Sequence, residues 1–265
     1  MTETFYLPGA EPFFIPGGRT GCIVIHGLAS SPQEVKWLGE SIAAREITTY
    51  GVRLSGHGAD FRDLQHVHWH DWLGNVLDAY QILSAQCDRV FLVGHSTGGT
   101  VALLAATHVP VAGVAALAAP VIFRGWTANN AHWLKHFRRY IDAPDTSELP
   151  QRIKAEQRRR GEPELGRVRY DRWASNGPAQ LYAMTRVTRE RLPLVKAPLL
   201  ALYSTQDTVI SFENCEILTE MVGSSDIEKH VLHKSEHNIM LDAERETVFQ
   251  WVNEFISRHS QPGGM

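Results

Sequence analysis

The chain has few cysteines and no long uninterrupted hydrophobic run. Only three cysteines stand among its 265 residues, at Cys22, Cys87 and Cys215. A sparse, odd set argues against a disulfide framework and a zinc site, and it favours a reducing compartment. We therefore expect the three cysteines to be packing residues. No apolar stretch approaches the ~20 residues that a membrane-spanning helix needs.

The first residues also lack the marks of a secretion signal, since they have no basic segment and no apolar core. Together with the cysteine count, this predicts a cytoplasmic protein without an integral membrane segment. The composition is 43% hydrophobic and 21% charged, which is ordinary for a soluble globular protein. A chain of this length buries roughly 70–75% of its unfolded surface, so one core can hold it without disulfides.

Charge is unevenly distributed along the chain. Residues 121–195 hold 15 Lys or Arg against 8 Asp or Glu, whereas the remainder holds 11 against 21. Two interpretations stay open: a solvated helical insertion, or a docking surface for an anionic substrate, a partner or a membrane. No nucleic-acid-binding motif accompanies the basic residues, so we expect no nucleic acid partner.

Buried strands alternate with amphipathic helices along most of the chain. Helices are indicated by apolar residues at spacings of three and four, as at Trp72, Val76, Ala79 and Leu83. Repeated strand–helix units predict an α/β fold, with a mostly parallel central sheet and helices on both faces. The predicted strands are Cys22–Ile25, Ile47–Val52, Val90–Val93, Val114–Ala119, Leu199–Tyr203 and Glu228–Leu232; later helices are predicted at Phe212–Met221 and Ala243–Ile256.

One helix start carries a local signature of its own. Ser31 is placed to cap the helix, Pro32 suits its first position, and Glu34 is placed to close a capping box. The sequence therefore predicts that Ser31 and Glu34 serve the helix that they begin.

The alternation is interrupted between about residues 122 and 193, where the sequence is polar, Arg-rich and without a clear strand. An insertion at this place would lie over the carboxyl ends of the strands, where such sheets bind ligands. We therefore expect a single domain, residues 1–265, with a cap over its active site. Some aromatic residues of this segment either line an acyl tunnel or form the cap's own core: Phe123, Trp126, Trp133, Phe137 and Trp173.

Ser96 lies in a glycine-bounded turn, residues 94–98, directly after a buried strand and before a run of small residues. A strand, a sharp turn and a helix are the setting of a nucleophile elbow. The turn lifts the serine, and the helix N-terminus faces developing negative charge.

A serine hydroxyl needs a base to take its proton and a carboxylate to orient that base. Asp207 and His237 follow Ser96 in the order that α/β-hydrolases use. Each comes in a loop just past a predicted strand, so all three belong at one sheet edge. The rivals for the acid are Asp142, Asp145, Asp226 and Asp242, and the rivals for the base are His230 and His233.

Other histidines have other expected roles. His26 and His95 are expected to be structural, with His26 bonding the loop backbone and His95 packing beside the turn. His66, His68 and His70 would share one face of an extended strand and could there hold a metal, but no carboxylate or cysteine pattern completes the set.

The chain resembles the carboxylesterase and monoacylglycerol lipase group of α/β-hydrolases over about residues 20–257. The matching pieces are His26-Gly27, Gly56-His57-Gly58, Gly94-His95-Ser96-Thr97-Gly98-Gly99, the Asp207 loop, and Ser235-Glu236-His237 with Asp242. The resemblance implies that Ser96 is the nucleophile, Asp207 the acid and His237 the base. It also implies an oxyanion hole formed by the backbone N–H groups of Leu28 and Thr97, a helical cap, and no cofactor or metal.

Two positions depart from the family pattern. Leu28 is often aromatic in relatives, and Thr97 is often Met or Leu. Backbone donors do not depend on the side chain, so the oxyanion hole is retained while the pocket beside the acyl carbon differs.

The resemblance implies hydrolysis of small-molecule carboxylic esters, acylglycerols among them. We expect the protein to be a monomer or a homodimer. A serine in place of an aspartate argues against dehalogenase and epoxide hydrolase chemistry. Thioesterase, lactonase, amidase and acyltransferase reactions use the same kind of site, because a fold does not fix its substrate. A non-catalytic ligand-binding protein with this fold is the alternative outside enzymes.

Overall fold

The computed structural model describes residues 5–142 and 149–260, apart from the side chains of residues 126–129, 131 and 134 in one helix. Its centre is a seven-stranded sheet in which only the first strand is antiparallel to its neighbour. This confirms the predicted fold class. The strand order is β1 (Phe13–Ile15), β3 (Thr48–Val52), β2 (Thr20–Ile25), β4 (Arg89–His95), β5 (Gly113–Leu117), β8 (Leu199–Ser204) and β9 (Ile227–Leu232).

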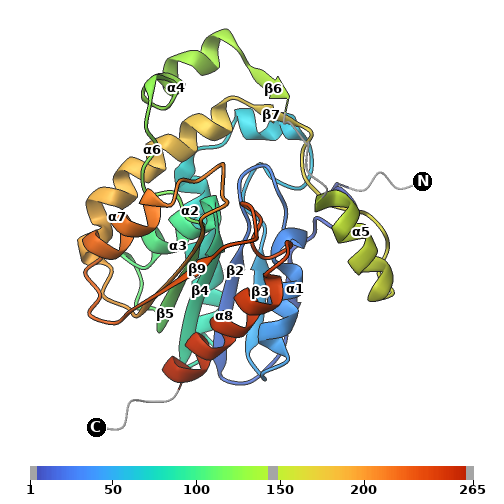
Figure 1. Cartoon of the computed structure of the whole chain (residues 1–265), viewed down its shortest axis with the longest axis vertical. Coiled ribbons are helices and arrows are strands. Elements are labelled where there is room, and N and C mark those ends of the chain that lie inside the picture. Colours follow the sequence, from blue (N-terminus) through green and yellow to red (C-terminus); the bar gives the residue numbers. More distant parts are fainter. Residues whose placement is uncertain (1–4, 143–148, 261–265) are drawn as a thin grey trace.

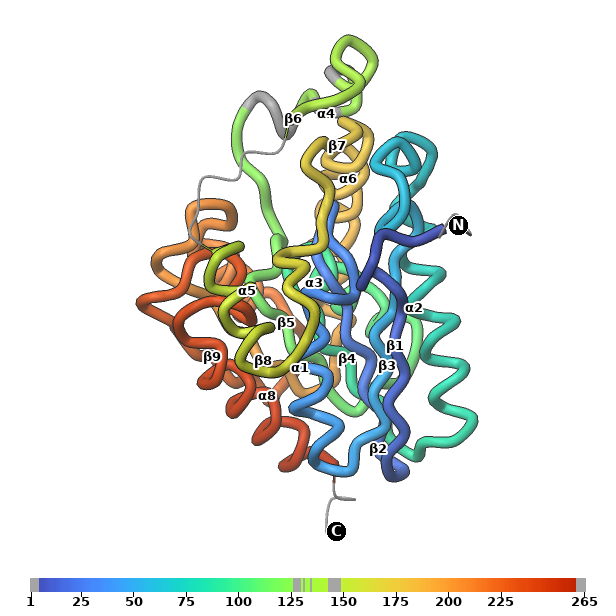
Figure 2. Tube along the Cα trace, turned by 90° about the vertical axis from the view of Figure 1, so that its right-hand side faces the viewer, coloured from blue at the N-terminus to red at the C-terminus, as the bar shows by residue number. Residues whose placement is uncertain are grey.

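Helices cover both faces of this sheet, as Figures 1 and 2 show. One face carries the apolar residues of α1 and α8, and the other carries those of α2, α3 and α7. In Figure 2 the strands lie between α2 on one side and α1 with α8 on the other. The bounds are α1 Gln33–Ala43, α2 Trp69–Ser84, α3 Thr97–Ala105, α7 Glu213–Met221 and α8 Arg245–Ser260, with a short 3₁₀ turn, η1, at Phe61–Gln65.

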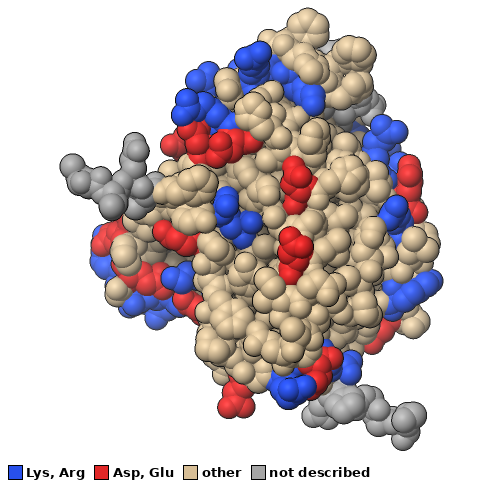
Figure 3. Space-filling view, turned by 180° about the vertical axis from the view of Figure 1, so that it is seen from behind, with Lys and Arg blue, Asp and Glu red and all other residues tan. Residues whose placement is uncertain are grey.

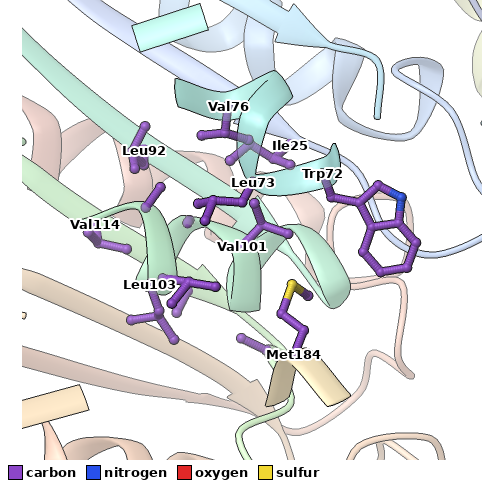
Figure 4. Close-up of a cluster of buried hydrophobic side chains, with 14 of the residues drawn as sticks. Ile25, Trp72, Leu73, Val76, Leu92, Val101, Leu103, Val114 and Met184 are labelled. Carbon is purple, nitrogen blue, oxygen red and sulfur yellow. The ribbon is translucent and has the colours of Figure 1, made fainter. Parts of the chain in front are cut away.

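Helix α3 is the most deeply buried helix, because every one of its residues is shielded from solvent. Its Val101 belongs to one apolar cluster with Val76 of α2, Leu92 of β4 and Met184 (Figure 4). Burying aliphatic side chains of this size stabilises the fold by about 1.5–3 kcal/mol each. This packing holds the start of α3, and the turn before it, in a fixed position.

The segment between β5 and β8 contains, in its described residues, three helices and a two-stranded ribbon. Its β6–β7 ribbon was not predicted, since each strand has three residues and the partners are far apart in sequence. Helix α6 packs on α3 and is part of the main core. The bounds are α4 Trp126–Phe137, β6 Tyr140–Asp142, α5 Leu149–Arg159, β7 Arg172–Ala174 and α6 Asn176–Arg191, followed by the 3₁₀ turn η2 at Leu192–Leu194.

The basic character of this segment is matched by acidic residues on the rest of the molecule. Figure 3 shows Lys and Arg side chains gathered at the end of the molecule where α4 and β6 lie. Several of the arginines bridge the two parts, so the segment and the acidic body attract each other. These pairs are Arg124–Glu213, Arg152–Asp242, Arg160–Glu40 and Arg167–Glu34. The exposed pairs among them contribute about 0–1 kcal/mol each, whereas the carboxylate of the Arg167–Glu34 pair is buried.

No helix in the described ranges combines the length and the apolar character that crossing a membrane requires.

Candidate active site

Ser96 occupies a strained turn between β4 and α3. Its φ is 51° and its ψ is −120°, a conformation that costs a non-glycine residue about 1–3 kcal/mol. Its backbone N–H donates to the carbonyl of Leu117 at 2.8 Å, which fixes the turn against β5. A Cβ on Gly94 would lie 2.2 Å from the carbonyl oxygen of Gly98, so the turn can close only with glycine there.

His237 and Asp207 extend from the ends of β9 and β8 toward this serine. The Ser96 hydroxyl donates to Nε2 of His237 at 3.0 Å, and Nδ1 of His237 donates to Asp207 Oδ2 at 2.7 Å. The other carboxylate oxygen, Oδ1, accepts the backbone N–H groups of Val209 and Ile210, each at 2.8 Å. The carboxylate is therefore held from both sides, and the imidazole is held in one orientation.

The surroundings shift both pKa values downward. Burial lowers the pKa of His237, and the hydrogen bond and charge of Asp207 only partly oppose that change. Burial alone would raise the pKa of Asp207, but the hydrogen bond from His237 and the two backbone donors outweigh it and lower that pKa. At neutral pH the pair is thus an ionised carboxylate beside a neutral imidazole, which is the state a general base requires.

Two backbone N–H groups beside Ser96 are free to receive a ligand oxygen. They belong to Leu28, in the loop after β2, and to Thr97, the first residue of α3; neither donates to an acceptor within the described chain. The loop bends at Ala29, whose φ is 55°. The Leu28 side chain lines the cavity above Ser96, whereas that of Thr97 is fully buried.

The rival acids and bases lie elsewhere. Asp242 pairs with Arg152 and accepts the N–H of Glu236, and Asp226 contacts His259. Asp142 is paired with Arg172, and Asp145 lies outside the described residues. The His230 ring stacks on Trp251, and Nδ1 of His233 is within hydrogen-bond distance of the Thr205 hydroxyl.

Glu34 does not close a capping box, so that prediction was wrong. Its carboxylate turns away from the helix and accepts the backbone N–H of Gly27 at 2.7 Å. Ser31 does not cap the helix either, since its hydroxyl donates to the carbonyl of Val168. Contacts with residues far away in the sequence outcompete the local cap in both cases.

His26 bonds the loop backbone as expected. Its Nδ1 donates to the Gly27 carbonyl at 2.8 Å, and its Nε2 accepts the N–H of Leu54 at 3.2 Å. Burial lowers the pKa of His26 to about 4, so the ring is neutral and able to make both bonds.

The segment with His66, His68 and His70 forms no extended strand, which corrects the basis for a metal site there. It leaves η1 and enters α2 at Trp69, so the three rings do not share the face of a strand. Across the described residues, one group has ligand atoms close enough for a metal: Asp226, Glu228 and His259, at the surface. Arg258 already pairs with Glu228 in that group.

A cavity of about 750 Å³ opens above Ser96 and His237. Its apolar wall comes mostly from the segment between β5 and β8, including Leu181 of α6. Among the singled-out aromatics, Phe123, Phe137 and Trp173 line the cavity, while Trp133 is exposed on α4. The side chain of Trp126 lies outside the described residues. Polar lining comes from Glu34, His95, Lys135, Arg138, Arg167, Arg169, Ser175, Thr208, Glu236 and Asn238.

The polar lining contains functional candidates that sequence reasoning missed. Glu34 and Arg167 approach the loop of Leu28 from two distant parts of the chain. The sequence signal for Glu34 is its position in the first turn of the helix that follows His26-Gly27. That position predicts a local helix cap, so the contact with Gly27 is missed. Nothing in the sequence singles out Arg167 among its many neighbouring arginines.

Comparisons with known proteins agree with the fold and indicate an ester hydrolase. The family model described as serine aminopeptidase, S33, matches residues 18–244. A thermostable monoacylglycerol lipase from Bacillus sp. strain H-257 is 28% identical, covering 98% of this chain and all of the relative. A carboxylesterase from Bacillus subtilis strain 168 is 25% identical, covering 94% and 96%.

A solved structure from a study of metagenome-derived lipolytic enzymes superposes with a TM-score of 0.86 at 28% identity, covering 96% of this chain and all of the other. The chain belongs to the serine aminopeptidase S33 family, as an α/β-hydrolase of the carboxylesterase and monoacylglycerol lipase group.

Proposed function

We propose that this carboxylic-ester hydrolase works through Ser96, His237 and Asp207 by way of an acyl-enzyme. The observation that carries the proposal is the unbroken chain of hydrogen bonds from Ser96 Oγ to His237, at 3.0 Å, and on to Asp207, at 2.7 Å. A serine is a competent nucleophile only with such a base in contact.

Acylation begins when Ser96 Oγ attacks the ester carbonyl carbon and its proton passes to Nε2 of His237. The carbonyl oxygen becomes an oxyanion, and the N–H groups of Leu28 and Thr97 donate to it. Asp207 stabilises the imidazolium that forms. His237 then gives the proton to the leaving alcohol oxygen as the carbon–oxygen bond breaks.

Deacylation repeats the same steps with water as the nucleophile. His237 takes a proton from water, the hydroxide oxygen bonds to the acyl carbon, and the same two donors hold the second oxyanion. The proton returns to Ser96 Oγ as its bond to the acyl group breaks. The products are a carboxylic acid and an alcohol, and the enzyme is regenerated.

We assign an amphiphilic ester with one acyl chain, such as a monoacylglycerol, as the substrate class. The cavity is large enough for a small lipid and has an apolar wall opposite a polar one. The relative with 28% identity is named a monoacylglycerol lipase. Residues 122–193 act as the cap in this proposal, since Phe123, Trp173 and Leu181 supply the wall on which an acyl chain would pack.

A panel of p-nitrophenyl esters of increasing acyl length, together with monoacylglycerols, tests the proposal. We expect turnover by the wild type and a rate lower by about 10⁴-fold or more in Ser96→Ala. The matched control is Ser84→Ala, at the exposed end of α2, which keeps the wild-type rate. Absence of turnover, or turnover that survives Ser96→Ala, refutes the proposed mechanism. Turnover of the p-nitrophenyl esters without turnover of monoacylglycerols refutes the substrate class alone.

A further inference from the structure

A second histidine–carboxylate pair lies directly behind the catalytic groups. His95 precedes Ser96 in the chain, and its Nδ1 is 3.1 Å from Oε2 of Glu34. Both side chains are almost completely buried, with about 1% of each exposed. The other ring nitrogen, Nε2, is 2.9 Å from the backbone carbonyl oxygen of His237.

The partners of this pair decide where the protons are. A carbonyl oxygen can only accept, so Nε2 of His95 must donate to His237. Glu34 accepts the N–H of Gly27 on Oε2 and a guanidinium N–H of Arg167 on Oε1, at 2.7 and 3.1 Å. Two such donors favour the carboxylate over the protonated acid. Burial alone would raise the pKa of Glu34, but His95, Arg167 and the Gly27 N–H together hold it well below its ordinary value. Nδ1 of His95 then donates as well.

We propose that His95 and the Glu34 carboxylate form a positioning pair that locks two loops to the nucleophile turn at Ser96: the oxyanion loop, which carries Gly27 and Leu28, and the base loop, which carries His237. This inference rests on the proposed function, because it assigns a role toward the same site. Glu34 holds the oxyanion loop through Gly27, whose amide directly precedes that of Leu28. His95 holds the base loop through the carbonyl of His237.

Close packing supports the assignment. A Cβ on Gly27 would lie 3.2 Å from Glu34 Oε2, 3.4 Å from the Cβ of Ser96 and 3.5 Å from Nδ1 of His95. The loop thus rests directly on the pair and on the nucleophile, so a displacement of Glu34 moves the Leu28 N–H away from the oxyanion. A misplacement of about 1 Å in such a site costs about 10²-fold in rate.

The pair also explains how the cap segment meets the catalytic loops. Arg167 comes from the segment between β5 and β8, and its guanidinium forms a salt bridge with the Glu34 carboxylate. Three donors contact the buried Glu34 carboxylate: the Arg167 guanidinium, the His95 ring and the Gly27 N–H. Together they offset the free-energy cost of burying its charge. Removing that charge leaves Arg167 and His95 without their shared partner.

The test compares Glu34→Gln with the matched variant Glu40→Gln on the same helix, where Glu40 pairs with Arg160 at the surface. We expect kcat to fall about 10–100-fold in Glu34→Gln with KM nearly unchanged, and no change in Glu40→Gln. A trifluoromethyl ketone, which forms an oxyanion on Ser96, should lose affinity by the same factor as kcat/KM. A wild-type kcat in Glu34→Gln, or an equal loss in both variants, overturns the inference.

A measurement on the wild type keeps the test independent of variant folding. The proton on Nε2 of His95 is buried and donates to the His237 carbonyl, so its ¹H–¹⁵N signal should persist in water with slow solvent exchange. Absence of that signal, or rapid exchange, overturns the inference. Failure of the proposed function itself would instead leave Ser96→Ala as active as the wild type.

Discussion

Nδ1 of His237 lies 2.7 Å from Oδ2 of Asp207, and two backbone N–H groups hold the other oxygen of that carboxylate. In Asp207→Asn the side chain keeps its shape but presents an amide, which can hold His237 in the wrong tautomer. We expect kcat to fall by about 10³–10⁴-fold in this variant, with little change in KM. Steady-state kinetics on a p-nitrophenyl ester measures the loss.

Asp242→Asn is the control for that prediction, because Asp242 was the rival acid nearest to His237 in sequence. Its carboxylate accepts the N–H of Glu236 and pairs with Arg152 at the surface. We expect a small effect on kcat. A large loss in Asp242→Asn together with an active Asp207→Asn would show that the acid has been assigned to the wrong residue.

The pH dependence of activity follows from the base. Burial lowers the pKa of His237 below its ordinary value of 6.5, and Asp207 only partly reverses that shift. The neutral imidazole is the active form, so activity is full at neutral pH and is lost as the pH falls through the lowered pKa. The acid limb of kcat/KM should therefore have its midpoint below 6.5. A midpoint above 6.5 in a substrate that does not itself titrate would contradict this.

Periodicity in the sequence was enough to predict the central elements of the fold. Trp72, Val76, Ala79 and Leu83 were placed on one face of a helix, and all four are buried in α2. The order of the strands along the chain also predicted that Ser96, Asp207 and His237 share one sheet edge, and the structure brings their side chains into contact.

Elements without a local signal could not be predicted. Strand β1 has three residues at the sheet edge and is held by Phe13, whose ring covers Gly51. The β6–β7 ribbon joins two short strands across a long stretch of chain, with no tight turn between them. Such strands are stabilised by their partners and carry too few residues to show an alternating pattern.

Glu34 shows why local reasoning misplaces some side chains. Its position after Ser31 and Pro32 is that of a capping residue, yet its partners His95 and Arg167 lie 61 and 133 residues away along the chain. A cap contributes about 0.5–2 kcal/mol, whereas a buried carboxylate left without donors costs several kcal/mol. The distant contacts therefore decide where this side chain goes.

Gly94→Ala should disrupt the nucleophile turn. The added Cβ would lie 2.2 Å from the carbonyl oxygen of Gly98, 2.3 Å from its carbonyl carbon and 2.5 Å from the backbone nitrogen of Gly99, and a rigid peptide group cannot yield that space easily. We expect loss of activity and a large drop in thermal stability. Gly74→Ala is the control, because Gly74 lies inside α2 and no atom is within 4 Å of the place that an added Cβ would take. This change should stabilise the protein by about 0.5–1 kcal/mol, since alanine favours a helix more than glycine does.

Thermal unfolding and esterase rates on both glycine variants check this pair of predictions. A Gly94→Ala protein with wild-type activity would mean that the turn is not as closely packed as the structure has it.

Leu181 should limit the length of the acyl chain. It is buried on α6 and lines the apolar wall of the cavity. A larger side chain in Leu181→Trp would fill space that the end of a long chain needs, so kcat/KM should shift toward short esters. One methylene in an apolar pocket is worth about 1–3 kcal/mol, or about 10–200-fold in discrimination. The control is Ala183→Trp, which places the same ring on the exposed face of α6 and should leave the preference unchanged. The ratio of kcat/KM for long and short p-nitrophenyl esters measures the shift, and an equal ratio in wild type and Leu181→Trp would mean that the acyl chain lies along another wall.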